Sequence, residues 1–152
     1  MIRMPRFKTE TVPRDKINVD NEFKPPDDPA FAYLLDETVA GRVPVYFAAV
    51  PLGLIRPFAP DFHPENYPIG RELVEAIIAD WREGQCQYMW IYPKENHFVM
   101  SDDYLIFASA VQGQPDFMPC LVLGDPRLPG VKDIQGSIRH EDVRQLLGLS
   151  AS

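Results

Sequence analysis

Apolar residues recur along the chain with two different spacings, and these spacings predict its helices and strands. Residues 71–84 carry apolar side chains on one face of a predicted amphipathic helix, at positions 73, 74, 77, 78 and 81. Residues 88–92 and 97–100 are short apolar or aromatic runs joined by a polar turn, which predicts a β-hairpin. Residues 117–123 are almost uninterruptedly apolar, which indicates a buried strand.

A strand is predicted to run directly into a helix at Ser101–Tyr104. We expect the Ser101 hydroxyl to cap this helix, which ends at Gly113. Asp102 and Asp103 then fall in the first turn, where the helix dipole favours negative charge by roughly 0.3–1 kcal/mol each. Such a junction commonly binds an anion, because its first backbone N–H groups point outward. In this chain, two carboxylates lie where such an anion would bind.

Further elements are predicted on both sides of this region. Asp28–Pro29 is typical of a helix start, and Gly41 is a suitable stop. Residues 43–50 read as a strand, and residues 52–55 are interpreted as its continuation after a kink. A short amphipathic helix is predicted over about 138–147, either packed on the body or docking a partner.

The order of elements over residues 43–124 resembles the ParB/sulfiredoxin-like fold. The resemblance is carried by Val50–Pro57, Glu72–Ile77, Trp90–Pro93 and Met118–Val122, which match its leading strand, first helix, second strand and closing strand. It implies an α/β (α+β) fold with a small mixed sheet and packed helices. The helix near residue 29 lies outside the family's minimal fold, as an N-terminal helical elaboration.

The sequence departs from the family's pattern at the phosphate-binding box. The family's phosphate-binding box is glycine, acid, arginine, arginine, and its arginines contact DNA or nucleotide phosphates. The matching residues here are Ser101, Asp102, Asp103 and Tyr104, so no arginine remains. The catalytic cysteine of the sulfiredoxin branch is absent from this junction as well. The resemblance therefore implies the fold and neither of these two activities.

Length and charge define the organisation of the chain. A chain of 152 residues is expected to form one domain, residues 27–152, preceded by an extended basic arm over residues 1–26. The chain carries −7 overall; residues 1–16 hold five basic groups against two acids, +3, which leaves −10 on the remainder. So acidic a body repels phosphate backbones. The arm could contact nucleic acid or an acidic partner, or could be disordered without a role.

Features of secreted and membrane proteins are missing from the sequence. Cys86 and Cys120 do not make a disulfide framework and are interpreted as buried thiols. No apolar run is long enough to span a bilayer, and the first residues lack the apolar region of a secretory signal. We therefore expect a cytoplasmic protein of bacterial type with no membrane partner.

Metal and catalytic candidates lie in two places. Asp61, His63 and Glu65 alternate in the proline-rich loop 56–69, a spacing that could bind zinc on one side of an extended segment, although such groups are usually only solvated. His97, with His63, could join Asp102 in a metal or hydrolytic site. No cofactor is predicted, and a divalent metal remains open.

The aromatic row Tyr88, Trp90 and Tyr92 allows two interpretations. These side chains share one face of a strand, and we expect them in the core, because Met89 and Ile91 on the other face are also apolar. Alternatively, with Phe58, Phe62 and Tyr67, they could form an exposed patch for a protein or for bases.

Two functional hypotheses follow. The first is a non-catalytic binding or regulatory module on a ParB-like fold that has lost the arginines of its phosphate box, with a protein partner. The alternative is a ParB-like nuclease, nucleotide hydrolase or DNA-binding protein that uses Asp102, Asp103 and a divalent metal. Ser101 and Tyr104 are further ligand-binding candidates, and no catalytic residue is assigned.

Overall fold

A five-stranded mixed sheet forms the centre of the protein in the computed structural model, which describes residues 6–7, 27–60, 71–82, 85–86, 88–101 and 103–135. The strand order is β2-β7-β5-β6-β3, with bounds Val45–Pro51, Phe117–Leu123, Met89–Lys94, His97–Met100 and Ile55–Pro57. The β2–β7 and β5–β6 pairs are antiparallel, and the β5–β7 and β3–β6 pairs are parallel. The predicted mixed α/β fold is confirmed.

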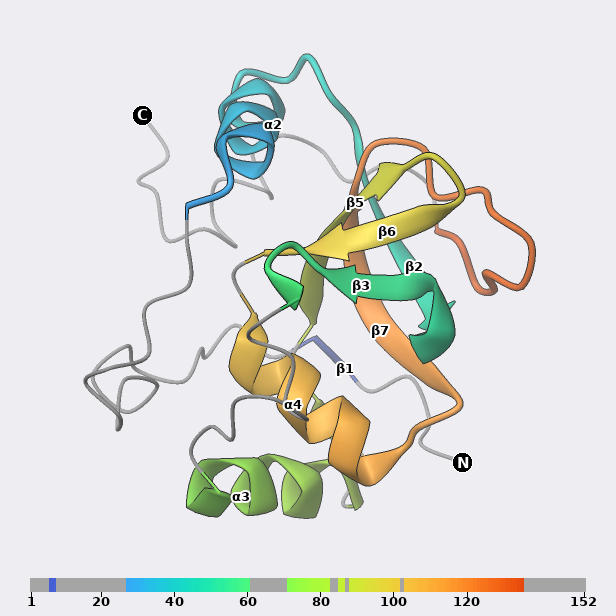
Figure 1. Cartoon of the computed structure of the whole chain (residues 1–152). Coiled ribbons are helices and arrows are strands. Elements are labelled where there is room, and N and C mark those ends of the chain that lie inside the picture. The colour runs from blue at the N-terminus through green and yellow to red at the C-terminus, as the bar shows by residue number, and fades with distance from the viewer. Residues whose placement is uncertain are drawn as a thin grey trace.

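The sheet is strongly curled. The 3₁₀ turn η1 (Leu52–Leu54) alone connects β2 to β3, although these strands form opposite edges of the sheet. Four residues reach at most about 14 Å, whereas four strand spacings in a flat sheet measure about 19 Å. The two edges must therefore approach each other, and Figure 1 shows β3 beside the end of β2. The expectation that residues 52–55 continue the first strand is wrong.

Helices cover both faces of this sheet (Figure 1). Helices α3 (Arg71–Arg82) and α4 (Tyr104–Gly113) lie on one face, and α2 (Pro29–Val39) lies on the other. The alternation of strand residues sorts them between two cores: the larger includes Met89, Ile91, Phe98 and Val122, and the smaller includes Val45, Tyr92, Val99 and Leu121. Since β5 contributes to both, the strand is buried on both faces as predicted.

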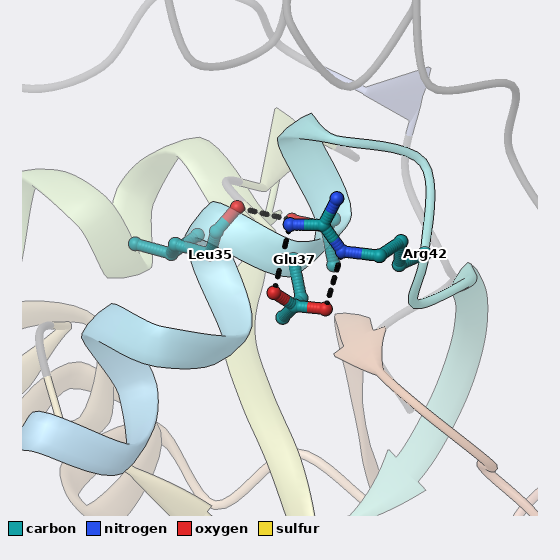
Figure 2. Close-up of polar contacts among 4 residues, drawn as sticks. Leu35, Glu37 and Arg42 are labelled. Atoms are coloured by element: carbon teal, nitrogen blue, oxygen red, sulfur yellow. Dashed lines mark hydrogen bonds and ion pairs between the residues drawn. The ribbon is translucent and has the colours of Figure 1, made fainter.

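Helix α2 begins and ends much as the sequence predicts. Asp28 is its N-cap, and its carboxylate accepts hydrogen bonds from the N–H groups of Ala30 (3.0 Å) and Phe31 (3.3 Å). Beyond the helix, Gly41 adopts a φ of 78°, which glycine adopts without strain. Arg42 folds back on Glu37 with two hydrogen bonds of 2.8 and 3.0 Å (Figure 2), and these lower the pKa of the Glu37 carboxyl.

The predicted helix cap at Ser101 is wrong. Helix α4 begins three residues later, at Tyr104, with Asp103 in the N-cap position and no side-chain cap. Asp103 therefore precedes the first turn, which contains no acid. At the other end, the left-handed residue is Gln114, with a φ of 51°, rather than Gly113. The helix itself is present as predicted, and every residue from Tyr104 to Ala110 is buried.

Other predictions concern the ends of the chain. Within the predicted N-terminal arm, β1 (Arg6–Phe7) pairs in parallel with β4 (Gln85–Cys86), which lies next to α3. The rest of the arm, the stop at Gly84 and the predicted helix over 138–147 lie outside the described residues. None of the described helices combines the length and the apolar character needed to cross a membrane.

Candidate functional site

The strand-to-helix junction is a structural joint between three strands. Extending the β5–β6 register, Trp90 lies opposite Ser101, where β6 has already left the sheet. The Trp90 N–H therefore needs another acceptor, and it donates to Oδ2 of Asp103 at 2.8 Å. A carboxylate takes the place that a backbone carbonyl would otherwise fill in the ladder. One of the two predicted acids is thus engaged in holding the sheet to α4.

Two more hydrogen bonds fix the same joint. The N–H of Phe58 donates to the carbonyl of Met100 at 2.8 Å, and the N–H of Ala59 donates to the Tyr104 hydroxyl at 3.0 Å. Tyr104 is only 2% exposed, so its ring belongs to the core, and burial raises the pKa of its hydroxyl. These bonds tie the segment after β3 to the start of α4.

Ser101 is buried at this joint, with 7% of its surface exposed. Within the part of the chain that the structure describes, its hydroxyl has no hydrogen-bond partner. Asp102, the remaining junction candidate, lies outside the described residues. The structure therefore brings Ser101, Asp103 and Tyr104 together at one point, as the sequence predicts, in a joint that is largely closed to solvent.

His97, the histidine candidate that the structure describes, does not join this cluster. His97 is the first residue of β6 and Ser101 follows its last, so the two lie about 13 Å apart at a rise of roughly 3.3 Å per residue. Asp61, His63 and Glu65 lie outside the described residues. Among the residues that the structure describes, no group of three or more histidine, cysteine or acidic side chains is arranged to hold a metal ion.

A buried carboxylate–phenol pair lies elsewhere, between α2 and the sheet. The Tyr92 hydroxyl donates to Oδ2 of Asp28 at 2.6 Å, and these residues are 5% and 7% exposed. Phe31 stacks on the Tyr92 ring with centroids 6.4 Å apart. The sequence identifies Asp28 as a cap, but only the tertiary structure brings it to a residue 64 positions away. The pair anchors α2 to the sheet.

The Asp28–Tyr92 pair predicts a pH-dependent contribution to stability. Burial, the hydrogen bond to Asp28 and the charge of that carboxylate raise the pKa of Tyr92 above its ordinary value of 10.0. A raised pKa favours the neutral phenol in the folded state, so this contribution is complete below pH 10 and declines as the pH rises above that value. We expect the difference in unfolding free energy between wild type and Tyr92→Phe to shrink above pH 10 in urea titrations. A difference that stays constant up to pH 11 contradicts this assignment.

The fold is a mixed α/β type, with a curled five-stranded sheet and helices on both faces. No family model and no curated protein matches the chain. A crystal structure of sulfiredoxin from Arabidopsis thaliana is similar over 52% of this chain and 85% of its own, with 10% identity and a TM-score of 0.44. The chemistry of this chain has to be argued from its own residues.

Proposed function

We propose that this protein is a non-catalytic binding module for a protein partner, in which the phosphate-binding box of a ParB-like fold has become a structural joint. The observation that carries the proposal is the hydrogen bond from the Trp90 N–H to Asp103. This bond uses an acidic side chain of the junction to hold the sheet to the start of α4. An anion brought to this junction would lie beside the Asp103 carboxylate, which the bond from Trp90 holds there.

Electrostatics support the same conclusion. A phosphate placed about 4 Å from one carboxylate meets a repulsion of about 4 kcal/mol at an effective dielectric constant near 20. That repulsion lowers affinity roughly a thousandfold. The chain as a whole carries −7, which adds to the repulsion of nucleotides and nucleic acids at long range.

The outer face of α2 supplies a surface for a protein partner. Its exposed residues are the apolar or aromatic Pro29, Ala30, Ala32 and Tyr33, the last with 63% of its surface exposed, together with one acid, Asp36. The inner face of the same helix packs Phe31 on the sheet. Exposed apolar residues that gather on one side of a helix can mark a contact surface for another protein. We therefore assign the outer face of α2 as the contact surface, in a cytoplasmic protein.

Phosphate ligands test the proposal directly. We expect calorimetric titration of the protein with ATP, or with duplex DNA, to give no binding at about 0.1 mM ligand and roughly 0.15 M salt, with or without Mg²⁺. Micromolar affinity for either ligand overturns the proposal.

The partner surface is tested with matched variants at Tyr33. Tyr33→Asp places a charge on the apolar face and should abolish retention of the physiological partner in quantitative affinity capture, whereas Tyr33→Phe should preserve it. Equal retention by both variants contradicts the assignment of α2. The metal-dependent nuclease or hydrolase hypothesis stays a prediction that Asp103 variants distinguish from this one.

A further inference from the structure

A hollow of about 550 Å³ lies between α3 and α4, on the face of the sheet opposite α2. It is lined by Glu75, Ile78 and Arg82 of α3 and by Gln112 and Gly113 of α4. The volume falls within the range of sites that bind small groups, roughly 300–1,000 Å³. We call it the α3–α4 hollow.

Two polar side chains of the hollow offer hydrogen-bond donors. Arg82 and Gln112 are exposed, and neither side chain has an ion pair or hydrogen bond within the part of the chain that the structure describes. Acids outnumber bases in this protein by 22 to 15, yet the Arg82 guanidinium forms no ion pair with a carboxylate of the described residues, Glu75 of the same hollow included. A guanidinium offers two parallel N–H groups that match the two oxygens of one carboxylate.

The floor of the hollow is apolar. Gly113 packs directly against α3: a Cβ placed on it would lie 3.5 Å from Cγ1 of Ile78 and 3.6 Å from Cζ3 of Trp81. Ile78 lines the hollow and is only 8% exposed, so it forms a fixed surface there. An apolar group of a ligand can rest on this floor while its charged end reaches Arg82.

The negative groups around the hollow limit which anion it accepts. Glu75 lines it, and both helices direct their C-terminal ends toward it, where the helix dipole is negative. A ligand with a single carboxylate can be matched by Arg82, but a second negative charge would be repelled. A basic group nearby in the ligand would be favoured by Glu75.

We propose that the α3–α4 hollow binds the C-terminal carboxylate of a partner polypeptide whose last side chain is apolar. Arg82 and the Gln112 amide donate to the carboxylate, and the last side chain lies on Ile78 and Gly113. This inference rests on the proposed function, because it names the part of a protein partner that the module recognises. Capture of a terminal carboxylate is a known mode of peptide recognition.

The test uses a synthetic hexapeptide, Gly-Ser-Gly-Lys-Gly-Leu with an acetylated N-terminus, as the free acid and as the C-terminal amide. We expect calorimetry to detect the acid with a dissociation constant on the order of 0.1–1 mM, and the amide at least about tenfold more weakly. Arg82→Gln should weaken binding of the acid about tenfold, and Arg56→Gln, an exposed arginine on β3, should leave it unchanged. Since Arg82 is exposed, its removal should not affect folding, and Gln112→Leu provides a second variant of the same site.

Other results of these titrations contradict the inference. Equal binding of acid and amide, or no binding of either, overturns it. Hexanoate or free leucine binding as tightly as the peptide assigns the hollow to small carboxylates and overturns the peptide assignment. If the peptide does not bind and neither ATP nor DNA binds, the inference fails and the proposed function stands. If ATP binds with micromolar affinity and Arg82→Gln does not change that affinity, only the proposed function is overturned.

Discussion

Asp28→Ala is expected to lower the free energy of unfolding by about 3 kcal/mol. The substitution removes the N-cap of α2, a loss of about 1 kcal/mol. It also leaves the hydroxyl of Tyr92, a residue only 5% exposed, without its acceptor, a loss of about 1–3 kcal/mol. Urea denaturation of the purified protein measures the change.

Two further variants separate the cap from the buried pair. Asp36→Ala removes an exposed carboxylate from the same helix and should change stability by less than about 0.5 kcal/mol. Tyr92→Phe keeps the cap but removes one donor to Asp28, so the double variant should show a coupling energy on the order of 1 kcal/mol. If Asp28→Ala costs no more than Asp36→Ala, α2 is not anchored in this way.

Asp103→Ala is expected to cost about 2 kcal/mol of stability. It leaves the Trp90 N–H without its carboxylate acceptor at a part-buried position, and hydrogen bonds to charged groups contribute about 1.5–3 kcal/mol. Asp103→Asn retains an oxygen acceptor and should cost less. Asp116→Ala, which removes an exposed acid just before β7, is the matched control and should have almost no effect.

The same variants distinguish the two functional hypotheses. In a structural joint, stability falls from wild type to Asp103→Asn to Asp103→Ala. In a metal-dependent nuclease or hydrolase, Asp103→Asn abolishes activity while the unfolding midpoint stays close to that of wild type. Unchanged stability in Asp103→Ala, together with loss of a metal-dependent activity, would refute the joint and favour the enzyme.

The elements were largely predictable because their signals are local. Asp28–Pro29 marks a helix start, since an acidic cap and proline at the first turn satisfy local backbone requirements. The strand His97–Met100 and the turn before it also lie as predicted. The cap prediction at Ser101 was wrong because a good capping side chain does not fix where a helix begins: α4 starts at Tyr104, after Asp103, whose carboxylate accepts from the Trp90 N–H.

The path of η1 shows a second limit of local patterns. Residues 52–55 have the apolar character of a strand, and a kinked continuation of β2 is the simplest local interpretation. The chain instead crosses to the opposite edge, because the sheet curls and brings β6 within reach of Ile55. No local feature of these residues specifies the curl.

Local spacing predicted most of the helices and strands that the structure describes, and it placed acids at the junction before α4. Spacing and backbone preferences act over a few residues, so one segment suffices to express them. The contacts of Asp103 and Asp28 follow only from the folded chain, since both carboxylates accept hydrogen bonds from residues of β5. The tertiary structure also decided that Arg82 and Gln112 share a hollow, because packing of α3 on α4 joins residues 30 positions apart. Such contacts depend on the folded sheet, and no short stretch of sequence contains them.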